Sequence, residues 1–162
     1  MRARVKVNQR ELKKLQKRID TTVNENVIEA WIEECLRDMA KKLVRKIKER
    51  TPVNTGLLRN SWKVGSIKKT GSIYEIEVFT EVEYAKFVEE GFKAHFVPGY
   101  WQGNQFVYDP AAKTGMQVGK PGTYVKGRFM VLLAEFDLER EKRAFLQRKQ
   151  KQLLKGIIEG RG

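Results

Sequence analysis

Hydrophobic residues recur at helical spacing over the segment that precedes Pro52. They form two adjacent columns of residues four positions apart, with most charged residues outside them, which is typical of a helix that has one face on a core. Thr22 and Glu25 fit a capping box, so the helix is predicted to begin near Val23 and to end before Pro52. The columns are Val27, Trp31, Cys35, Met39, Leu43 and Ile47, and Ile28, Ile32, Leu36, Ala40 and Val44.

A β-hairpin is predicted after this helix. Its first strand is expected over Leu58–Ile67, and Lys68–Gly71 is expected to connect it to the second strand. The returning strand is predicted over Ile73–Thr80, where hydrophobic and acidic residues alternate. This alternation places Tyr74, Ile76 and Val78 on one face of the strand and Glu75 and Glu77 on the other.

A short helix and a long irregular segment follow the hairpin. Tyr84–Glu90 predicts two helical turns, which Gly91 ends as a C-cap. Residues 92–127 are rich in glycine, proline and aromatic residues. A loop of this length in a compact domain is usually functional or disordered, and the aromatic residues argue against a plain flexible linker. We therefore expect an ordered insertion with short strands at Phe106–Tyr108 and Tyr124–Lys126.

Helices are also predicted at both ends of the chain. The first covers residues 8–19, with Leu12, Leu15 and Ile19 on one face, and the last begins near Arg128. A cluster of aliphatic residues ends the last helix and would either bind a partner subunit or fold back on the chain's own core. Phe129, Leu132, Leu133 and Phe136 are predicted to pack inward, and the terminal cluster is Leu153, Leu154, Ile157 and Ile158.

Together these elements predict an α+β fold. A long N-terminal helix packs on a small antiparallel β-sheet, and a short central helix, a long loop insertion and a closing C-terminal helix follow. Residues 1–21 are expected to form a basic helical N-terminal extension. Residues 22–140 are expected to form the α+β core domain with its insertion at 92–127, and residues 141–162 a basic C-terminal helical extension.

The charge of the chain is large and unevenly distributed. Its 162 residues include 33 Lys and Arg against 20 Asp and Glu, a formal net charge of +13. The excess of positive charge lies near both ends, whereas residues 71–97 are acidic. Such asymmetry suggests surfaces that face an anionic partner, or surfaces of opposite sign that meet across subunits; the alternative is a set of solvated helical faces.

The sequence also argues against three classes of protein: membrane-spanning, secreted and globally disordered ones. No stretch approaches the roughly 18 consecutive apolar residues that a membrane-spanning helix needs. The basic residues at the start, Met1–Lys6, are followed by no apolar region, so no secretory signal is expected. With 41% hydrophobic residues the chain has enough apolar side chains to bury a core, which argues against global disorder.

Candidate chemistry is sparse. Cys35 is the only cysteine and His95 the only histidine, which excludes an internal disulfide and a zinc site with several cysteines. Cys35 lies on the apolar column and is predicted to be buried, and His95 is interpreted as a packed or exposed side chain. Gly115–Pro121 departs from a phosphate-binding loop in its glycine spacing and in the proline at the Ser/Thr position. We therefore predict a protein that is not an enzyme, with no catalytic residue, cofactor or metal site.

Three motifs in the centre of the chain resemble a family of tailed-bacteriophage proteins. They are Thr51–Trp62 (TPVNTGLLRNSW), Tyr84–Gly91 (YAKFVEEG) and Gly127–Met130 (GRFM), and they occur in the family's order. The resemblance spans about residues 22–140. The family comprises small neck or tail-completion proteins, encoded between the head genes and the major tail genes and also found in prophage-derived particles.

The motif residues also have plain structural interpretations. Thr51 and Pro52 end the long helix, and Gly91 ends the short one. The motifs are therefore predicted to determine the fold rather than to form an active site. Residues 92–126 and 1–20 depart from the family pattern and are expected to select the particular partner. The fold-determining residues are Thr51, Pro52, Thr55, Gly56, Leu58, Trp62, Tyr84, Ala85, Phe87, Gly91, Gly127 and Phe129.

The resemblance implies a structural subunit of a phage or phage-like particle. The subunit would lie at the head–tail junction, or neck, or at the head-proximal end of the tail. It would act there as a ring of identical copies, expected to be sixfold, in tail completion and head–tail joining. Its partners would be other copies of itself and neighbouring neck, tail-tube or tail-terminator proteins, with non-specific contact to DNA in the channel and no membrane contact. Assembly would take place in the bacterial cytoplasm.

Such a ring requires two different surfaces that complement each other. An acidic hairpin and a basic helix, or the basic residues 140–151, would supply them. The alternative function is a sequence-independent nucleic-acid-binding protein that uses its basic helices directly. The predicted subunit interface is Glu75, Glu77, Glu81 and Glu83 with Lys41, Lys42, Arg45 and Lys46, and the predicted partner-binding residues are Tyr100, Trp101, Phe106, Tyr108, Leu153, Leu154, Ile157 and Ile158.

Overall fold

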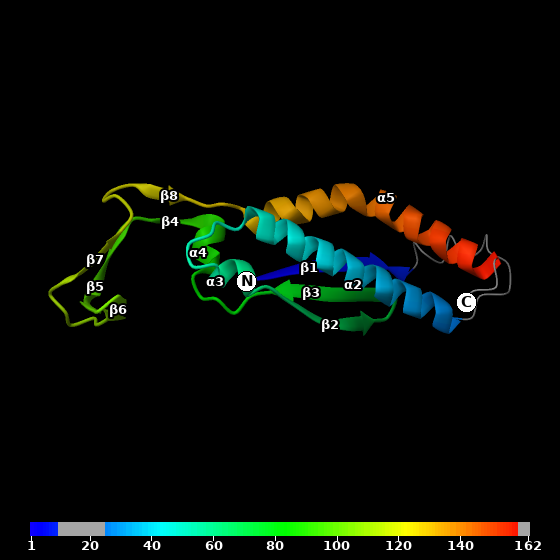
Figure 1. The fold of residues 1–162 in the computed structure, drawn as a ribbon, viewed down its shortest axis with the longest axis horizontal. Helices are drawn as coiled ribbons and strands as arrows, with labels where there is room; N and C mark the ends of the chain where they lie inside the picture. Colours follow the sequence, from blue (N-terminus) through cyan, green and yellow to red (C-terminus); the bar gives the residue numbers. More distant parts are fainter. Residues whose placement is uncertain (10–24, 159–162) are drawn as a thin grey trace. The chain divides into compact units, whose positions relative to one another are not determined.

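The computed structural model describes residues 1–9 and 25–158, and Figure 1 shows their secondary structure. The chain divides into two compact units, Met1–Glu83 with Met130–Gly162, and Tyr84–Phe129. The predicted helix over residues 8–19 lies largely outside the described residues, as does the predicted start of the long helix at Val23. The described elements are helices and antiparallel sheets, so the predicted α+β class is confirmed.

The described residues of the first unit form two long helices, one short helix and a three-stranded sheet. The sheet is antiparallel in the order β1-β3-β2, with β1 at Arg2–Asn8, β2 at Lys63–Thr70 and β3 at Ile73–Phe79. Helix α2 (Glu25–Arg50) packs on this sheet and alongside helix α5 (Met130–Ile158), as Figure 1 shows. The predicted long helix and the predicted returning strand are thereby confirmed.

The core of the first unit lies between the sheet and α2. Every second residue of β1 and of β3 is buried there, which produces the alternating pattern of an antiparallel strand with one solvated face. Both predicted columns of α2 face this core, apart from Val27 near its start, which is 42% exposed, and Val44, which is half-buried. The buried residues are Ala3, Val5 and Val7 of β1, Tyr74, Ile76 and Val78 of β3, and Ile28, Trp31, Ile32, Cys35, Leu36, Met39, Ala40, Leu43 and Ile47 of α2.

Strand β1 is an element that the sequence prediction lacks. Residues 1–21 are expected as a helical extension, but Arg2–Asn8 pairs along its whole length with β3, from Arg2 opposite Phe79 to Asn8 opposite Ile73. The physical reason is a strict alternation of basic and small apolar residues, which buries one face and solvates the other. This part of the expected extension therefore belongs to the core sheet.

The predicted strand over Leu58–Ile67 is displaced toward the C-terminus. A short helix, α3 (Leu57–Asn60), occupies its beginning, and β2 starts only at Lys63 and continues to Thr70. Gly56 has a φ of +81°, a left-handed conformation that glycine adopts without strain, and it turns the chain into α3. Leu58 points to the core from this short helix and is only 4% exposed.

The predicted inward face of α5 is wrong. Phe129, Leu132, Leu133 and Phe136 are between 38% and 62% exposed. The buried side chains are instead those of Met130, Val131, Ala134 and Leu138. Two apolar stripes coexist on this part of the helix, and the stripe that contains the small residue Ala134 is the buried one. Because alanine adds little bulk, the two helices can approach closely along this stripe.

A short helix and two small sheets make up the second unit. Helix α4 spans Ala85–Glu90 and Gly91 is its C-cap, as predicted. One sheet pairs β4 (Gly91–Lys93) with β8 (Tyr124–Lys126), and the other has the order β6-β5-β7. The strands of the second sheet are β5 (His95–Gln102), β6 (Gln105–Tyr108) and β7 (Gly115–Val118).

The expectation of an ordered insertion with short strands is confirmed at both predicted places, by β6 and by β8. Strands β4, β5 and β7 were not expected from the sequence. Pro98 and Gly99 interrupt the pattern of β5, and the strand changes its partner at this point. Residues 95–98 pair with β7, and residues 99–102 pair with β6. Among the described helices none is long and apolar enough to cross a membrane.

Candidate interaction surfaces

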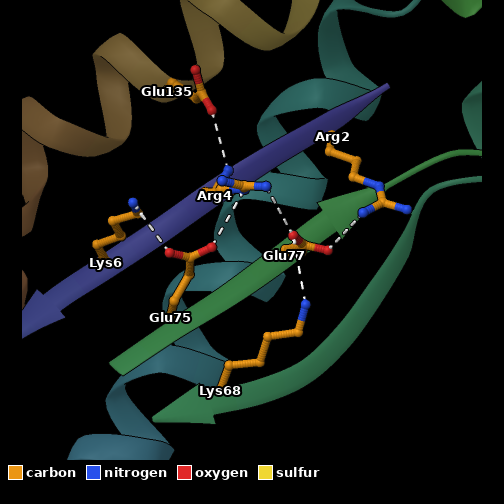
Figure 2. Close-up of polar contacts among 7 residues, drawn as sticks. All are labelled: Arg2, Arg4, Lys6, Lys68, Glu75, Glu77 and Glu135. Atoms are coloured by element: carbon orange, nitrogen blue, oxygen red, sulfur yellow. Dashed lines mark hydrogen bonds and ion pairs between the residues drawn. The ribbon is translucent and has the colours of Figure 1, made fainter. Parts of the chain in front are cut away.

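The carboxylates of Glu75 and Glu77 lie on the outer face of the three-stranded sheet. Figure 2 shows cations from both neighbouring strands around them. Arg4 contacts both acids at 3.3 Å, through Nε to Glu75 and through a terminal guanidinium nitrogen to Glu77. The other contacts are Lys6 to Glu75 at 3.2 Å, Arg2 to Glu77 at 3.5 Å and Lys68 to Glu77 at 3.9 Å.

The strand register makes the outer face of the sheet cationic. Arg4 stands opposite Glu77, and Lys6 stands opposite Glu75. Cross-strand pairs of opposite charge stabilise a sheet, and four cations here surround two acids. The side chains of Glu75 and Glu77 are only 20% and 12% exposed, so little of either carboxylate is available to another subunit. Their role in a subunit interface stays a prediction.

The other two acids of that predicted interface are more accessible. Glu81 and Glu83 are both exposed. Lys63 donates a hydrogen bond of 2.7 Å to Glu81, and this contact lowers the pKa of the Glu81 carboxyl. Glu83 makes no ion pair with any other described residue. A second subunit can therefore reach these two carboxylates more readily than those on β3.

On the basic side of the predicted interface, Lys42 and Lys46 point to α5. Both contact Glu141, with 2.7 Å between Lys46 Nζ and a carboxylate oxygen. Hydrogen bonds from Lys42 and Lys46 lower the pKa of Glu141 to about 2. A carboxylate with two ammonium partners from the neighbouring helix fixes the alignment of α2 against α5. These two lysines thus act within the chain.

Lys41 and Arg45 complete the predicted basic surface and are both exposed. Arg45 lies 3.7 Å from Glu49, one turn along α2. Exposed pairs of this kind contribute about 0.3–0.5 kcal/mol, so Arg45 can exchange its partner at little cost. Lys41 makes no ion pair within the described part of the chain.

All four aromatic residues that are predicted to bind a partner lie on the β5–β6 hairpin. Trp101 and Tyr108 are 59% and 64% exposed, and Tyr100 is 48% exposed. Phe106 is half-buried, and its ring meets the ring of Trp101 edge to face with 5.4 Å between the centroids. The structure therefore brings the four side chains together on one small element.

The terminal aliphatic cluster of α5 has a different environment. Lys149 ties this half of the helix to α2, with a 2.6 Å contact to Glu34 and a second contact to Asp38. Leu153 and Leu154 are half-buried. The side chains of Ile157 and Ile158 lie outside the described part of the structure.

An exposed apolar surface lies near the N-terminus of α5, where the prediction placed core residues. Leu132, Leu133 and Phe136 are 58%, 46% and 62% exposed. Leu132 and Phe136 also line a depression of about 390 Å³ between α5 and β1, together with Val5, Met39 and Leu138. Helical periodicity alone could not identify this surface, since it fits both apolar stripes of α5 equally well.

Several motif residues hold turns and close contacts. Thr51 Oγ1 donates a 2.7 Å hydrogen bond to the Ile47 carbonyl at the end of α2. A Cβ at Gly127 would lie 2.2 Å from the Glu89 carbonyl oxygen, and one at Gly91 would lie 2.4 Å from the Val125 carbonyl oxygen. Glycine is therefore required at both positions.

The remaining motif residues divide by burial. Phe87 and Phe129 are 55% and 38% exposed, so they do not act as core residues within the described chain. The buried set is Leu58, Trp62 and Ala85, whereas Pro52, Thr55 and Tyr84 are exposed. Thr55 Oγ1 accepts a hydrogen bond from the Leu57 N–H, and Tyr84 is the N-cap of α4.

Cys35 and His95, which the sequence singled out for candidate chemistry, lie in different units of the structure. No group of three or more His, Cys, Asp or Glu side chains that could hold a metal lies among the described residues. Cys35 is buried as predicted, and burial raises the pKa of its thiol to about 12. His95 is exposed, and Gly115 begins strand β7 rather than a phosphate-binding loop.

Comparisons with known proteins agree with the resemblance seen in the motifs. Residues 13–91 match the family model described as "Bacteriophage HK97-gp10, putative tail-component". The chain is 31% identical over 134 residues to "Phage-like element PBSX protein XkdI" of Bacillus subtilis (strain 168), which covers 73% of this chain and 83% of that protein. It is also 31% identical over 101 residues to "Uncharacterized protein YqbI" of the same organism, over 52% of this chain and 59% of that protein. No solved structure matches the chain. The motifs, the fold and these relatives together place the chain in the HK97-gp10-like family of bacteriophage structural proteins.

Proposed function

We propose that the protein forms a homo-oligomeric ring at the head–tail junction, or neck, or at the head-proximal end of the tail of a phage or phage-like particle. It would act there in tail completion and head–tail joining. The observation that carries this proposal is the large apolar area left exposed in both units, on α5 and on the β5–β6 hairpin. Large exposed apolar patches are typical of surfaces that bind another protein.

The charges of the first unit support the same proposal. Glu75, Glu77 and Glu141 are balanced by cations of the same chain, so the folded subunit does not need a partner to neutralise them. The surfaces that remain for assembly are therefore the apolar ones, the exposed cations and the exposed acids Glu81 and Glu83. Its neighbours would be other neck, tail-tube or tail-terminator proteins, and assembly would take place in the bacterial cytoplasm.

Two measurements test this function. Native mass spectrometry and negative-stain electron microscopy of the purified full chain should detect closed rings, for which the family resemblance suggests six copies. Deletion of the gene from an inducible prophage should leave separate heads and tails, and expression of the chain from a plasmid should restore joined particles. A chain that stays monomeric at high concentration, together with normal particles from the deletion strain, would contradict the proposal.

A second candidate function is sequence-independent binding to nucleic acid. Arg143, Arg148 and Lys151 are exposed along the second half of α5, and none of them forms an ion pair with another described residue. Lys and Arg side chains on one surface suffice to bind DNA phosphates, and each neutralised phosphate steepens the dependence of affinity on salt. In a ring these cations would line a channel that DNA passes through.

Fluorescence anisotropy with a labelled duplex at several salt concentrations tests this second function. Strong, salt-dependent binding by the monomer would favour a nucleic-acid-binding protein over a ring subunit. The variant R143Q/R148Q/K151Q should then lose most of the binding. The variant K86Q/K93Q/K126Q, which changes exposed lysines of the second unit, serves as a control with the same loss of charge.

A further inference from the structure

The β5–β6 hairpin has the composition of an interface core. No charged residue lies between Phe96 and Tyr108, although a third of the chain is charged. Trp101 and Tyr108 point largely into solvent at 59% and 64% exposure. Depletion of charge and enrichment in Trp, Tyr and Phe distinguish the centres of protein–protein interfaces from other surfaces. This hairpin is therefore built to contact another protein.

One face of the hairpin carries most of this apolar surface. Trp101 pairs with Phe106 and Gly99 pairs with Tyr108, so the three aromatic residues share a face. A Cβ at Gly99 would lie 2.7 Å from the Phe106 ring, which means that the glycine makes room for the ring. Phe106 in turn holds Trp101 edge to face. The aromatic face is thus held in place before a partner binds, which reduces the entropy lost on binding.

Helix α5 offers a surface of matching character. Leu132, Leu133 and Phe136 form its exposed apolar face beside the depression that Met39 and Leu138 line. The acid within this stretch, Glu135, accepts a hydrogen bond from the Arg4 N–H and so reaches toward β1 (Figure 2). Arg140 follows Phe136 by one turn and lies over its ring, 5.9 Å from the centroid.

We propose that the β5–β6 hairpin of one copy docks on the apolar face of α5 in a second copy of this chain. This inference rests on the proposed ring. Each copy has one hairpin and one α5 face. A series of copies joined by this contact uses each surface once, and when the series closes into a ring no hairpin or α5 face is left exposed. The charges at the edge also match, because Asp109 directly follows the hairpin and Arg140 lies one helical turn beyond Phe136, at the edge of the apolar face.

The exposed aromatic side chains supply a substantial part of the area that such a contact needs. Trp101, Tyr108 and Phe136 are each about three-fifths exposed. At about 200 Å² for an aromatic side chain, they supply roughly 350 Å² of surface for the contact. A specific interface buries roughly 1,200 Å² or more in total, so three side chains supply more than a quarter of the minimum. Leu132, Leu133 and the surrounding polar rim add to this area.

Placing a charge at the centre of either surface tests the docking. W101E and L133E should each shift the protein from rings to monomers and weaken assembly at least tenfold, as measured by analytical ultracentrifugation across a concentration series. V53E is the matched control, since Val53 is 58% exposed and lies in neither surface. Unchanged circular dichroism and melting temperature establish that each monomer remains folded. Rings that persist in both W101E and L133E would overturn the docking.

A cross-link between copies tests the geometry directly. A tagged W101C chain and an untagged F136C chain are mixed and oxidised, with the buried Cys35 left unchanged. A disulfide-linked pair that contains one chain of each kind supports the docking, and each variant alone should give no linked pair. Rings that form without the mixed pair overturn the docking but leave the ring intact. An unmodified chain that never forms rings overturns the proposed function itself.

Discussion

The backbone N–H of Arg4 donates a hydrogen bond of 3.3 Å to the carboxylate of Glu135, which lies 131 positions further along the chain. Arg4 lies on β1, at the edge of the sheet, and Glu135 lies on α5. An edge strand presents backbone groups that can pair with a strand of another molecule. The Glu135 carboxylate accepts a hydrogen bond from one of these backbone groups, the Arg4 N–H, and so prevents it from pairing with a strand of another molecule.

Replacement of Glu135 by alanine should therefore have two effects. The lost hydrogen bond should lower the free energy of unfolding by about 0.5–1.5 kcal/mol, measured by urea denaturation. The free N–H of Arg4 should also increase non-specific self-association at high concentration, measured by light scattering. E139A is the control, because Glu139 is an exposed acid one turn further along α5 that pairs only with Lys142 in the described structure. Equal effects of E135A and E139A would contradict this role.

Acid should weaken the attachment of α5 to α2. The pKa of Glu141 is about 2 in the folded chain, against an ordinary value of 4.5. A carboxyl whose pKa is lower in the folded state stabilises the protein above the unfolded pKa, and this contribution is lost as the pH falls from about 4.5 toward 2. Because the side chain is 42% exposed, solvent screening reduces the effect to about 1 kcal/mol or less.

The variant E141Q isolates this contribution. Urea denaturation of the unmodified chain and of E141Q should differ at pH 7, and the difference should shrink as the pH falls from about 4.5 toward 2. A constant difference across this range would show that Glu141 acts through something other than its charge. E49Q serves as the control, since Glu49 pairs only within α2 in the described structure.

Gly127 should tolerate no side chain. A Cβ there would lie 2.2 Å from the Glu89 carbonyl oxygen and 2.7 Å from the Gly91 nitrogen, both of which are backbone atoms that cannot move separately. G127A should destabilise the second unit by about 2 kcal/mol or more. Hydrogen exchange followed by mass spectrometry should show faster exchange in peptides from residues 84–129.

A matched alanine variant distinguishes this clash from a general loss of glycine. Gly71 has a φ of +58°, and no neighbouring atom lies within 4 Å of the place that a Cβ would occupy, so G71A should cost only the strain of a left-handed alanine. That strain is about 1 kcal/mol. The G71A substitution should therefore leave hydrogen exchange in residues 84–129 unchanged. Faster exchange in this region for G71A as well would argue against a specific clash at Gly127.

Substitutions at two sets of acidic residues should distinguish an effect on folding from an effect on assembly. E77K should lower the stability of the monomer, because it places a fifth cation among Arg2, Arg4, Lys6 and Lys68. E81K/E83K changes exposed acids and should leave the melting temperature nearly unchanged. If acidic residues of this region form a subunit interface, E81K/E83K should reduce ring formation in ultracentrifugation. Normal rings from E81K/E83K would remove these two acids from the interface.

Much of the first unit could be predicted from the sequence because its patterns are long. Helix α2 has 26 residues with two apolar columns, and β3 alternates over its whole length. Strand β1 also alternates, but its basic residues led to the prediction of an extension. What decides between the two interpretations is pairing with β3, more than 60 residues away, and a local pattern contains no information on such pairing.

The candidate surfaces were predictable only in part. The aromatic side chains between positions 100 and 108 could be identified from the sequence, because they stand out in a chain so rich in charged residues. The ion pairs of Glu75 and Glu77 with Arg4 and Lys6 could not be predicted from the sequence, because they depend on the register of two strands that are distant along the chain. The exposed face of α5 was hidden for another reason, since Met130–Ala134–Leu138 and Leu132–Leu133–Phe136 are both plausible core stripes. Only the fit against α2 selects the first.

The thiol of Cys35, the only cysteine of the chain, can be used to measure how often the first unit opens. With its pKa raised to about 12 and its side chain in the core, the sulfur is both protonated and inaccessible in the folded state. Alkylation by a small reagent must therefore wait for the first unit to open, and its rate measures the frequency of that event. Added to assembling or joined particles, the same reagent would monitor how firmly the first unit is held closed at each stage of assembly.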